Sequence, residues 1–141
     1  MFLFENYFHS GDKNFSISDN AVRYVFVSKE NVLHVGTAGN GLDKMDLNHP
    51  GEFYNYRHSE YISSSLINDQ LQTIYEDEFG LIWIGTNNGL SKYDPVKQFF
   101  DHIRHKIDDA NSLNDKTVWC IEEDNKGILW IGTREGITAV I

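Results

Sequence analysis

Short runs of apolar and β-branched residues, separated by turn-forming residues, make up most of the chain. In the clearest stretch, Ile74–Asp94, three such runs are divided by Asp77-Glu78-Phe79-Gly80 and Asn87-Asn88-Gly89. Asp at the first and Gly at the fourth position favour a type I turn, and Asn-Gly favours a tight hairpin through positive φ angles. The pattern therefore predicts three antiparallel strands joined by two hairpin turns.

The same pattern returns further along the chain. Three of its residues recur 47 positions later: Asp77 as Asp124, Trp83 as Trp130 and Thr86 as Thr133. A strand-rich repeat of this length predicts a propeller-like array with one sheet per repeat.

A weaker copy lies upstream, where Val35-Gly36-Thr37 precedes Gly41–Asp46. In this copy Ser28, Asn31 and His34 stand at the positions of the Asp, the Gly and the Trp. Ser and Asn still favour a turn, so we expect the same strand arrangement here.

Each unit continues into an aromatic segment and a polar loop. Residues 53–58 and 99–105 predict fourth strands, and residues 2–9 form a similar aromatic segment. The units span about 18–58, 67–105 and 113–141, and a strand like 2–9 would complete the last one. We therefore expect an all-β fold, a β-propeller segment of about three four-stranded antiparallel blades that is incomplete as a single chain.

The first strand of each unit has apolar residues three positions apart, such as Leu71 and Ile74, or Val118 and Ile121. Positions three apart in a regular strand lie on opposite faces, which predicts a sheet buried on both sides. Propellers close with about four to eight blades, so three blades leave an apolar face at each end. The expected partners are further blades, in cis or by self-association, for example two chains forming a six-bladed ring.

The chain has 141 residues, a net charge of −9 and a pI near 5.0. Because no basic residues cluster, we expect neither nucleic acid nor an anionic membrane as a partner. The single cysteine, Cys120, excludes an internal disulfide and is expected to be a small buried residue. No apolar run approaches the ~20 residues that span a bilayer, and Met1–Asn6 lacks the features of a signal peptide.

No catalytic, metal-binding or cofactor-binding set is evident, so we do not expect an enzyme. Adjacent acidic pairs such as Glu76-Asp77 lie on a strand and point apart, whereas glycosidase carboxylates converge on a sugar. His102 and His105 are three positions apart in a predicted strand and cannot share a metal ion.

Ligand contacts are expected where side chains vary on the repeated scaffold. The hairpins between second and third strands share a rim with the loops 59–69 and 106–116 that join successive units. Amides and one arginine on this rim suit hydroxyl and carboxylate groups, and Trp119 is an aromatic residue outside the repeat pattern. The candidate binding residues are Asn40, Asn87, Asn88, Arg134, Glu135 and Trp119.

The motif Glu-Asp-x-x-Gly-x-x-Trp-Ile-Gly-Thr-x-x-Gly-Leu at Glu76–Leu90, nearly repeated at Glu123–Ile137, resembles the two-component regulator propeller repeat. The segment Asn111–Asp115 is similar to that family's inter-blade loop, and the resemblance extends over nearly the whole chain. It implies a periplasmic propeller that senses glycan fragments and signals to a histidine kinase, which this chain does not contain.

Two other interpretations remain beside this non-enzymatic sensor. One is a self-assembling, lectin-like propeller that binds an oligosaccharide without a signalling partner. The other is a scaffold for protein interactions with no small ligand.

Overall fold

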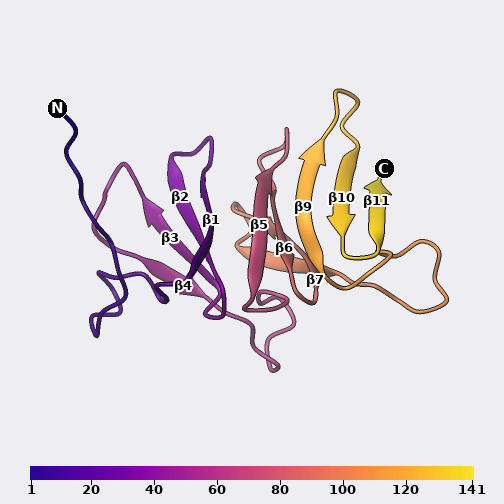
Figure 1. Ribbon diagram of the computed structural model, residues 1–141, viewed down its shortest axis with the longest axis horizontal. Coiled ribbons are helices and arrows are strands. Elements are labelled where there is room, and N and C mark those ends of the chain that lie inside the picture. The colour runs from indigo at the N-terminus through magenta and orange to yellow at the C-terminus, as the bar shows by residue number, and fades with distance from the viewer.

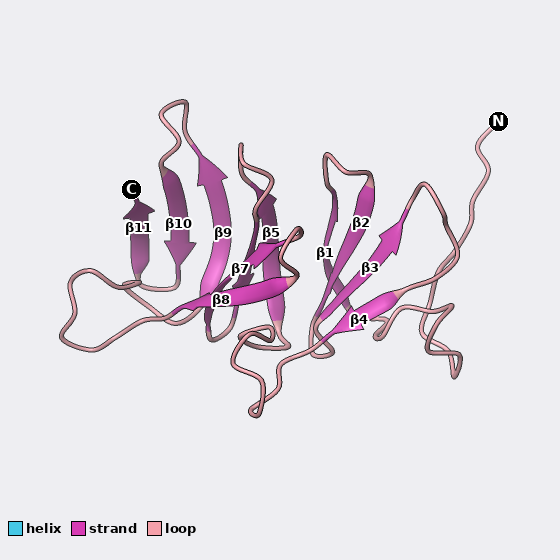
Figure 2. Ribbon diagram, turned by 180° about the vertical axis from the view of Figure 1, so that it is seen from behind, coloured by secondary structure: helices cyan, strands magenta, loops and turns pink.

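The computed structural model describes residues 1–141 as three antiparallel sheets without a helix (Figures 1 and 2). The first sheet, blade 1, has the order β1-β2-β3-β4, the second, blade 2, the order β5-β6-β7-β8, and the third, blade 3, the order β11-β10-β9. The strands are β1 (Val22–Val27), β2 (Val32–Thr37), β3 (Leu42–Asp46), β4 (Tyr54–Tyr56), β5 (Leu71–Glu76), β6 (Ile82–Thr86), β7 (Gly89–Asp94), β8 (Phe99–Ile103), β9 (Val118–Glu123), β10 (Leu129–Thr133) and β11 (Gly136–Val140).

The three sheets stand in a row with their first strands, β1, β5 and β9, side by side (Figure 1). One apolar core joins blades 1 and 2, where Leu42 packs with Leu71 and Ile82. A second core joins blades 2 and 3, where Trp83 packs with Ile121 and other residues. This face-to-face stacking confirms the all-β propeller segment expected from the repeat.

A β-bulge corrects one step of the sequence argument. The strand register shifts between Leu71 and Thr73, so that Gln72 is an extra residue in β5. A bulge breaks the two-residue alternation of a strand. Leu71 and Ile74 consequently lie in the same core against blade 1, and Thr73 lies against Val118 of blade 3 beside Gly85. The sheet is buried on both sides, but not for the reason that regular alternation suggested.

The repeated Asp joins the first turn to the Trp of the next strand. One Asp77 oxygen accepts hydrogen bonds from the Phe79 and Leu81 amides at 2.9 and 3.0 Å, and the other accepts the Trp83 indole N–H at 2.8 Å. Gly80 has a φ of +80°, which a side chain rarely adopts. The spacing Asp-x-x-Gly-x-x-Trp is therefore one hydrogen-bonded unit.

The same unit recurs in blade 3. Asp124 accepts the Lys126 and Ile128 amides and the Trp130 indole N–H, the last at 3.0 Å. The indole bond, followed by the two amides, lowers the pKa of the Asp124 carboxyl because each donor stabilises the charged form.

The repeated Thr closes the second hairpin of each blade. The Thr86 hydroxyl donates to the Gly89 carbonyl at 2.8 Å and accepts the Asn88 amide at 3.1 Å. Thr37 and Thr133 make the equivalent bonds. Only Gly89 has a positive φ in this turn, so the expectation of positive φ angles at both Asn88 and Gly89 is wrong for Asn88.

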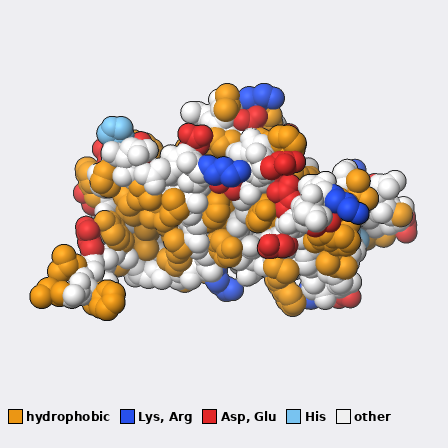
Figure 3. Space-filling view, turned by 90° about the horizontal axis from the view of Figure 1, so that it is seen from above, with side chains coloured by type: hydrophobic (Ala, Val, Ile, Leu, Met, Phe, Trp, Pro, Cys, Tyr) orange, Lys and Arg blue, Asp and Glu red, His pale blue; other side chains and the backbone are white.

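Both ends of the row expose positions that are buried elsewhere in the repeat. Leu42 and Leu90 are fully buried, whereas the equivalent Ile137 on blade 3 is 64% exposed. At the other end, Val25 on blade 1 is 59% exposed, although its counterpart Ile74 is 1% exposed. Figure 3 shows hydrophobic side chains gathered at the end that carries the N terminus. The apolar end faces expected of an open array are therefore present.

Two local expectations are wrong. Residues 2–9 form no strand, and the N terminus lies at the opposite end of the row from β11, so they cannot complete blade 3 within one chain (Figure 1). Tyr7 instead packs edge-on against Phe53 of blade 1, with ring centroids 5.8 Å apart. Cys120 is exposed because its side of blade 3 has no neighbouring sheet.

We expect Asp77→Ala to lower the free energy of unfolding by about 2–3 kcal/mol, because it leaves a buried indole N–H and two turn amides without their acceptor. Asp124→Ala is the matched control, since it removes the same bonds around the half-exposed Trp130 and should cost less. Urea denaturation followed by fluorescence measures both. Equal losses in the two variants would contradict the role of burial.

Gly85 marks the close contact between blades 2 and 3. A Cβ atom at this position would lie 2.6 Å from a Val118 methyl group and 2.7 Å from a Thr73 methyl group. We expect Gly85→Ala to destabilise the chain by about 1–3 kcal/mol through overpacking. Gly39→Ala is the control, because nothing lies within 4 Å of its Cβ position. Thermal unfolding of both variants tests the contact, and a neutral Gly85→Ala would refute it.

Candidate functional site

The hairpins between second and third strands share a rim with the loops that connect the blades. The Ala38 amide donates to the Ala21 carbonyl at 2.9 Å, and the Asn87 amide donates to the Gln70 carbonyl at 3.1 Å. The Arg134 amide bonds the loop before β9 in the same way. This loop rim lies opposite the rim that carries the Asp-x-x-Gly turns (Figure 1).

A histidine holds each connecting loop in shape. The Nδ1 atom of His58 lies 2.9 Å from the Leu66 carbonyl, and His9 and His105 make the same contact eight residues ahead. A serine near the end of the loop adds two bonds to the residue after the histidine. The Ser65 hydroxyl accepts the Ser59 amide and donates to the Ser59 carbonyl. Because the carbonyl only accepts, Nδ1 donates in each case, and this ring nitrogen is not available to a metal ion.

A polar cavity of about 420 Å³ opens on the loop rim of blade 1. At its base, buried Asp43 accepts the Ser18 amide at 2.8 Å, the Ser18 hydroxyl at 2.9 Å and the Asn55 side-chain amide at 2.9 Å. The cavity is lined by His9, Lys13, Ser16, Ile17, Ser18, Asn40, Asp43, Asn55 and Arg57. Amides, hydroxyls and two cations on one wall can bond hydroxyl and carboxylate groups of a ligand.

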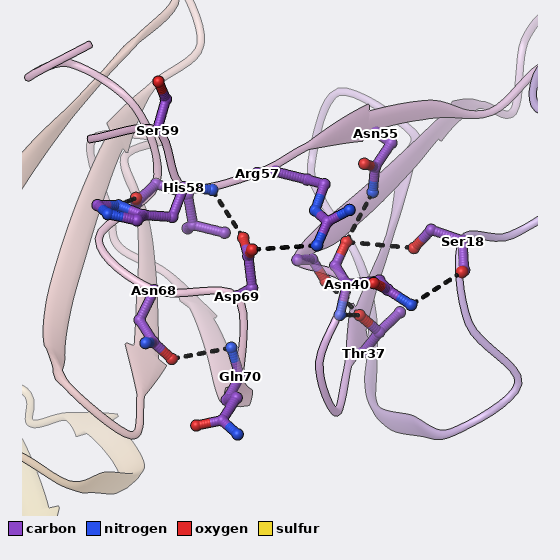
Figure 4. A network of polar contacts seen from close by, with 12 residues as sticks. Ser18, Thr37, Asn40, Asn55, Arg57, His58, Ser59, Asn68, Asp69 and Gln70 are labelled. Carbon is purple, nitrogen blue, oxygen red and sulfur yellow. Dashed lines mark hydrogen bonds and ion pairs between the residues drawn. The ribbon is translucent and has the colours of Figure 1, made fainter. Parts of the chain in front are cut away.

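A network of polar contacts links this cavity to the loop before blade 2 (Figure 4). Arg57 follows β4 and pairs with Asp69 at 3.3 Å, and the other Asp69 oxygen accepts the His58 amide at 2.6 Å. The Arg57 side chain is 53% exposed, so this guanidinium keeps donors free for a ligand. The pair also ties the end of blade 1 to the start of blade 2.

Asn40 is the one sequence-predicted residue that lines the cavity. Its side-chain amide donates to the Ser18 carbonyl at 3.2 Å, and its own carbonyl accepts the Asn55 side-chain amide at 2.9 Å. Asn87 belongs to a separate cluster, where it bonds Gln70 and Gln72, and the side chain of Asn88 is exposed nearby.

Arg134 and Glu135 form a third cluster on blade 3. Arg134 pairs with Asp115 at 3.2 Å and with Glu135 at 3.8 Å. The Thr117 amide, helped by the charge of Arg134, lowers the pKa of the Asp115 carboxyl. The rim residues thus share one side of the molecule but bond within their own blades, and do not converge on one point.

Trp119 lies at the bulge of β9, where the register shifts between Val118 and Cys120. Gln72 and Arg23 occupy the bulges of β5 and β1, and the Arg23 guanidinium donates to the Gln72 side-chain oxygen at 3.4 Å. Trp119 is 53% exposed, which agrees with its being outside the repeat packing.

Sequence reasoning missed the residues that shape the cavity, namely Asp43, Asn55 and Arg57. The available signal was Asp43, which stands on the third strand where blades 2 and 3 have Ser91 and Thr138. A carboxylate at a position otherwise held by a hydroxyl changes the local chemistry. It attracts Asn55 as a second donor, beyond the loop amide that Ser91 also accepts.

Two segments of the chain, residues 65–88 and 112–135, match the family model described as two component regulator propeller. They correspond to the second and third copies of the repeat. These two segments therefore carry the two-component regulator propeller repeat. No curated protein matches the chain.

Solved propeller structures resemble the fold. The extracellular domain of BT3049 from B. thetaiotaomicron, described as a hybrid two component system, matches with a TM-score of 0.76 and 18% identity over 94% of this chain and 20% of that one. The extracellular domain of BT4673 from the same organism gives 0.50 and 21% over 93% of this chain and 22% of that one.

Virginiamycin B lyase from Staphylococcus aureus also matches, with a TM-score of 0.62 and 16% identity over 89% of this chain and 43% of that one. This neighbour is named as an enzyme, so the fold by itself does not separate a sensor from a catalyst. The chain spans between about a fifth and less than half of these structures. It has no helix with the length and apolar character needed to cross a membrane.

We expect Asp43→Asn to loosen the loop over the cavity, because an amide cannot accept all three hydrogen bonds that the carboxylate accepts. Hydrogen exchange of the Ser18 amide should accelerate by about tenfold or more, the loss of roughly one such bond. The Ile67 amide, which donates to Ser91 at 3.0 Å, is the internal control and should keep its rate. Unchanged exchange at Ser18 would contradict the role of Asp43.

Proposed function

We propose that the chain is the propeller segment of a non-enzymatic sensor that binds glycan fragments on its loop rim. The observation that carries this proposal is the polar cavity around Asn40, Asp43 and Arg57 on a repeated scaffold. The side chains differ from blade to blade here, whereas the turns of the opposite rim repeat. Varied side chains on a fixed framework are suited to specific recognition.

The chemistry of the cavity favours a polyhydroxylated ligand. Asn40 and Asn55 present amides, which both donate and accept, and Ser16 and Ser18 present hydroxyls. Lys13 and Arg57 add positive charge for an acidic sugar. Trp119 of blade 3, which does not line this cavity, is exposed and offers a flat apolar surface of the kind that stacks on a sugar ring.

The comparisons support an extracytoplasmic setting for this sensor. BT3049 and BT4673 are both described by their extracellular domains. We infer a periplasmic location for this segment, with further propeller blades as its neighbours. Those blades would cover the exposed residues Val25 and Ile137 at the two ends of the row.

Self-association into a lectin-like ring is the second candidate, and the same open faces favour it. Blade 1 and blade 3 expose the two sides that pack together between blades 1 and 2 and between blades 2 and 3. Mass measurement in solution separates the candidates, because a ring of two chains has twice the 16.3 kDa of one chain.

Calorimetric titration with a panel of neutral and acidic oligosaccharides tests glycan binding. We expect at least one member of the panel to bind, and Arg57→Gln to weaken that binding by about tenfold, the loss of one charged hydrogen bond. Asn125→Ala is the matched control, since Asn125 lies in an exposed turn on the opposite rim and its loss should change nothing.

If no oligosaccharide of the panel binds, the proposal of glycan recognition is wrong and a scaffold for protein interactions is favoured. Equal losses in Arg57→Gln and Asn125→Ala would show that binding does not occur on the loop rim.

A further inference from the structure

Blade 1 departs from the repeat at the space between blades 1 and 2. Trp83 fills the equivalent space between blades 2 and 3, held by the carboxylate of Asp77. In blade 1 the smaller His34 replaces the Trp, and Ser28 replaces the Asp. A cavity of about 470 Å³ opens beside His34, on the rim that carries the Asp-x-x-Gly turns.

A second difference in blade 1 leaves a lysine without an anionic partner. Lys44 pairs across the sheet with Tyr54, whereas its counterpart Lys92 pairs with Asp101 and forms an ion pair with it at 3.6 Å. Lys44 Nζ donates instead to the Tyr93 hydroxyl at 3.1 Å and lies 4.4 and 4.6 Å from the ring centroids of Tyr93 and Tyr56. Neither phenol carries a charge near neutral pH, so the ammonium is not neutralised.

The charges around the cavity limit what can occupy it. Glu76 accepts the Lys29 amide at 2.8 Å, and Asp94 accepts the Val96 and Lys97 amides, so both carboxylates are already bonded. Glu30 and Glu78 add two more negative charges to the lining. A ligand with several negative charges would be repelled by this lining, whereas one charge can reach Lys44. The apolar residues of the walls include Phe79, Leu81, Ile82 and Val96.

We propose that this cavity is a binding site for a small organic monocarboxylate, with the carboxylate at Lys44 beside His34 and an uncharged body between the turns of blades 1 and 2. The site is independent of the loop rim, because it lies on the opposite side of the molecule and uses none of the same residues. It is also complete within this chain.

The protonation states agree with this assignment. Burial lowers the pKa of Lys44 to about 8, so the amine is mainly charged at pH 7. Burial, together with the charge of Lys44, lowers the pKa of His34 to about 4, so the imidazole is neutral, and its Nδ1 donates to the Val32 carbonyl at 3.1 Å. Burial raises the pKa of Tyr93 to about 12. The other charged groups that line the cavity are the carboxylates of Glu30, Glu76, Glu78 and Asp94 and the amine of Lys29.

Calorimetric titration with phenylacetate and acetate tests the site. Phenylacetamide and acetamide, the uncharged analogues of these two ligands, are the controls. We expect the carboxylates to bind and the amides not to. Binding should weaken about tenfold for each pH unit above about 8, as Lys44 loses its proton. Lys44→Met should weaken binding roughly 10- to 100-fold, and Lys92→Met, its matched control in blade 2, should leave binding unchanged.

His34→Trp combined with Ser28→Asp provides a second, independent variant, because it restores the Asp–Trp pair of the repeat and fills the cavity while keeping Lys44. It should abolish phenylacetate binding without lowering the melting temperature. The proposal would be overturned if neither carboxylate binds or if the amides bind as tightly as the carboxylates. It would also be overturned if Lys44→Met and Lys92→Met weaken binding equally. None of these results bears on oligosaccharide binding at the loop rim.

Discussion

The stacking of the blades depends on how the Asp carboxylate of the repeat is used. One oxygen of Asp77 organises the turn and the other holds the Trp83 indole. An indole N–H buried without an acceptor would cost about 1–3 kcal/mol, and the acid removes this cost for a large aromatic side chain between the sheets. In blade 2 this bond joins the turn to the core that packs against blade 3.

The fold was predictable because the sequence contains two clear copies of the repeat. Asp77 and Asp124, with their Gly and Trp partners, define turn and strand without any tertiary information. The faces of β5 were not predictable, because the bulge at Gln72 has no local signal and reverses the alternation that follows it. The exposure of Cys120 was missed for another reason: burial at that position belongs to the neighbouring blade and not to the strand itself.

The candidate site shows the same limit. Asn40 was found because it lies in a hairpin of known position, whereas Asp43, Asn55 and Arg57 come from strands and strand ends whose side chains meet only after folding. The repeat predicts which rim carries variable residues. It does not predict that blade 1 gathers them into a cavity while blades 2 and 3 keep theirs as separate pairs, because this depends on Asp43 alone having two oxygens to share.

Blade 1 differs from the other blades on both rims, and each difference changes the position of a carboxylate. On the turn rim, the loss of the Asp removes the acceptor that a buried Trp requires, so the smaller His34 is the compatible residue and a cavity results. On the loop rim, a carboxylate is gained at Asp43 and draws three donors to itself. Blade 1 thus lacks a carboxylate at Ser28 on the turn rim and has one at Asp43 on the loop rim. As a result, it has two cavities of different chemistry. One has a cation without an anionic partner at its base, and the other has a carboxylate that accepts hydrogen bonds from Ser18 and Asn55. A scaffold built from a repeated unit can change its surface in this way without changing its fold.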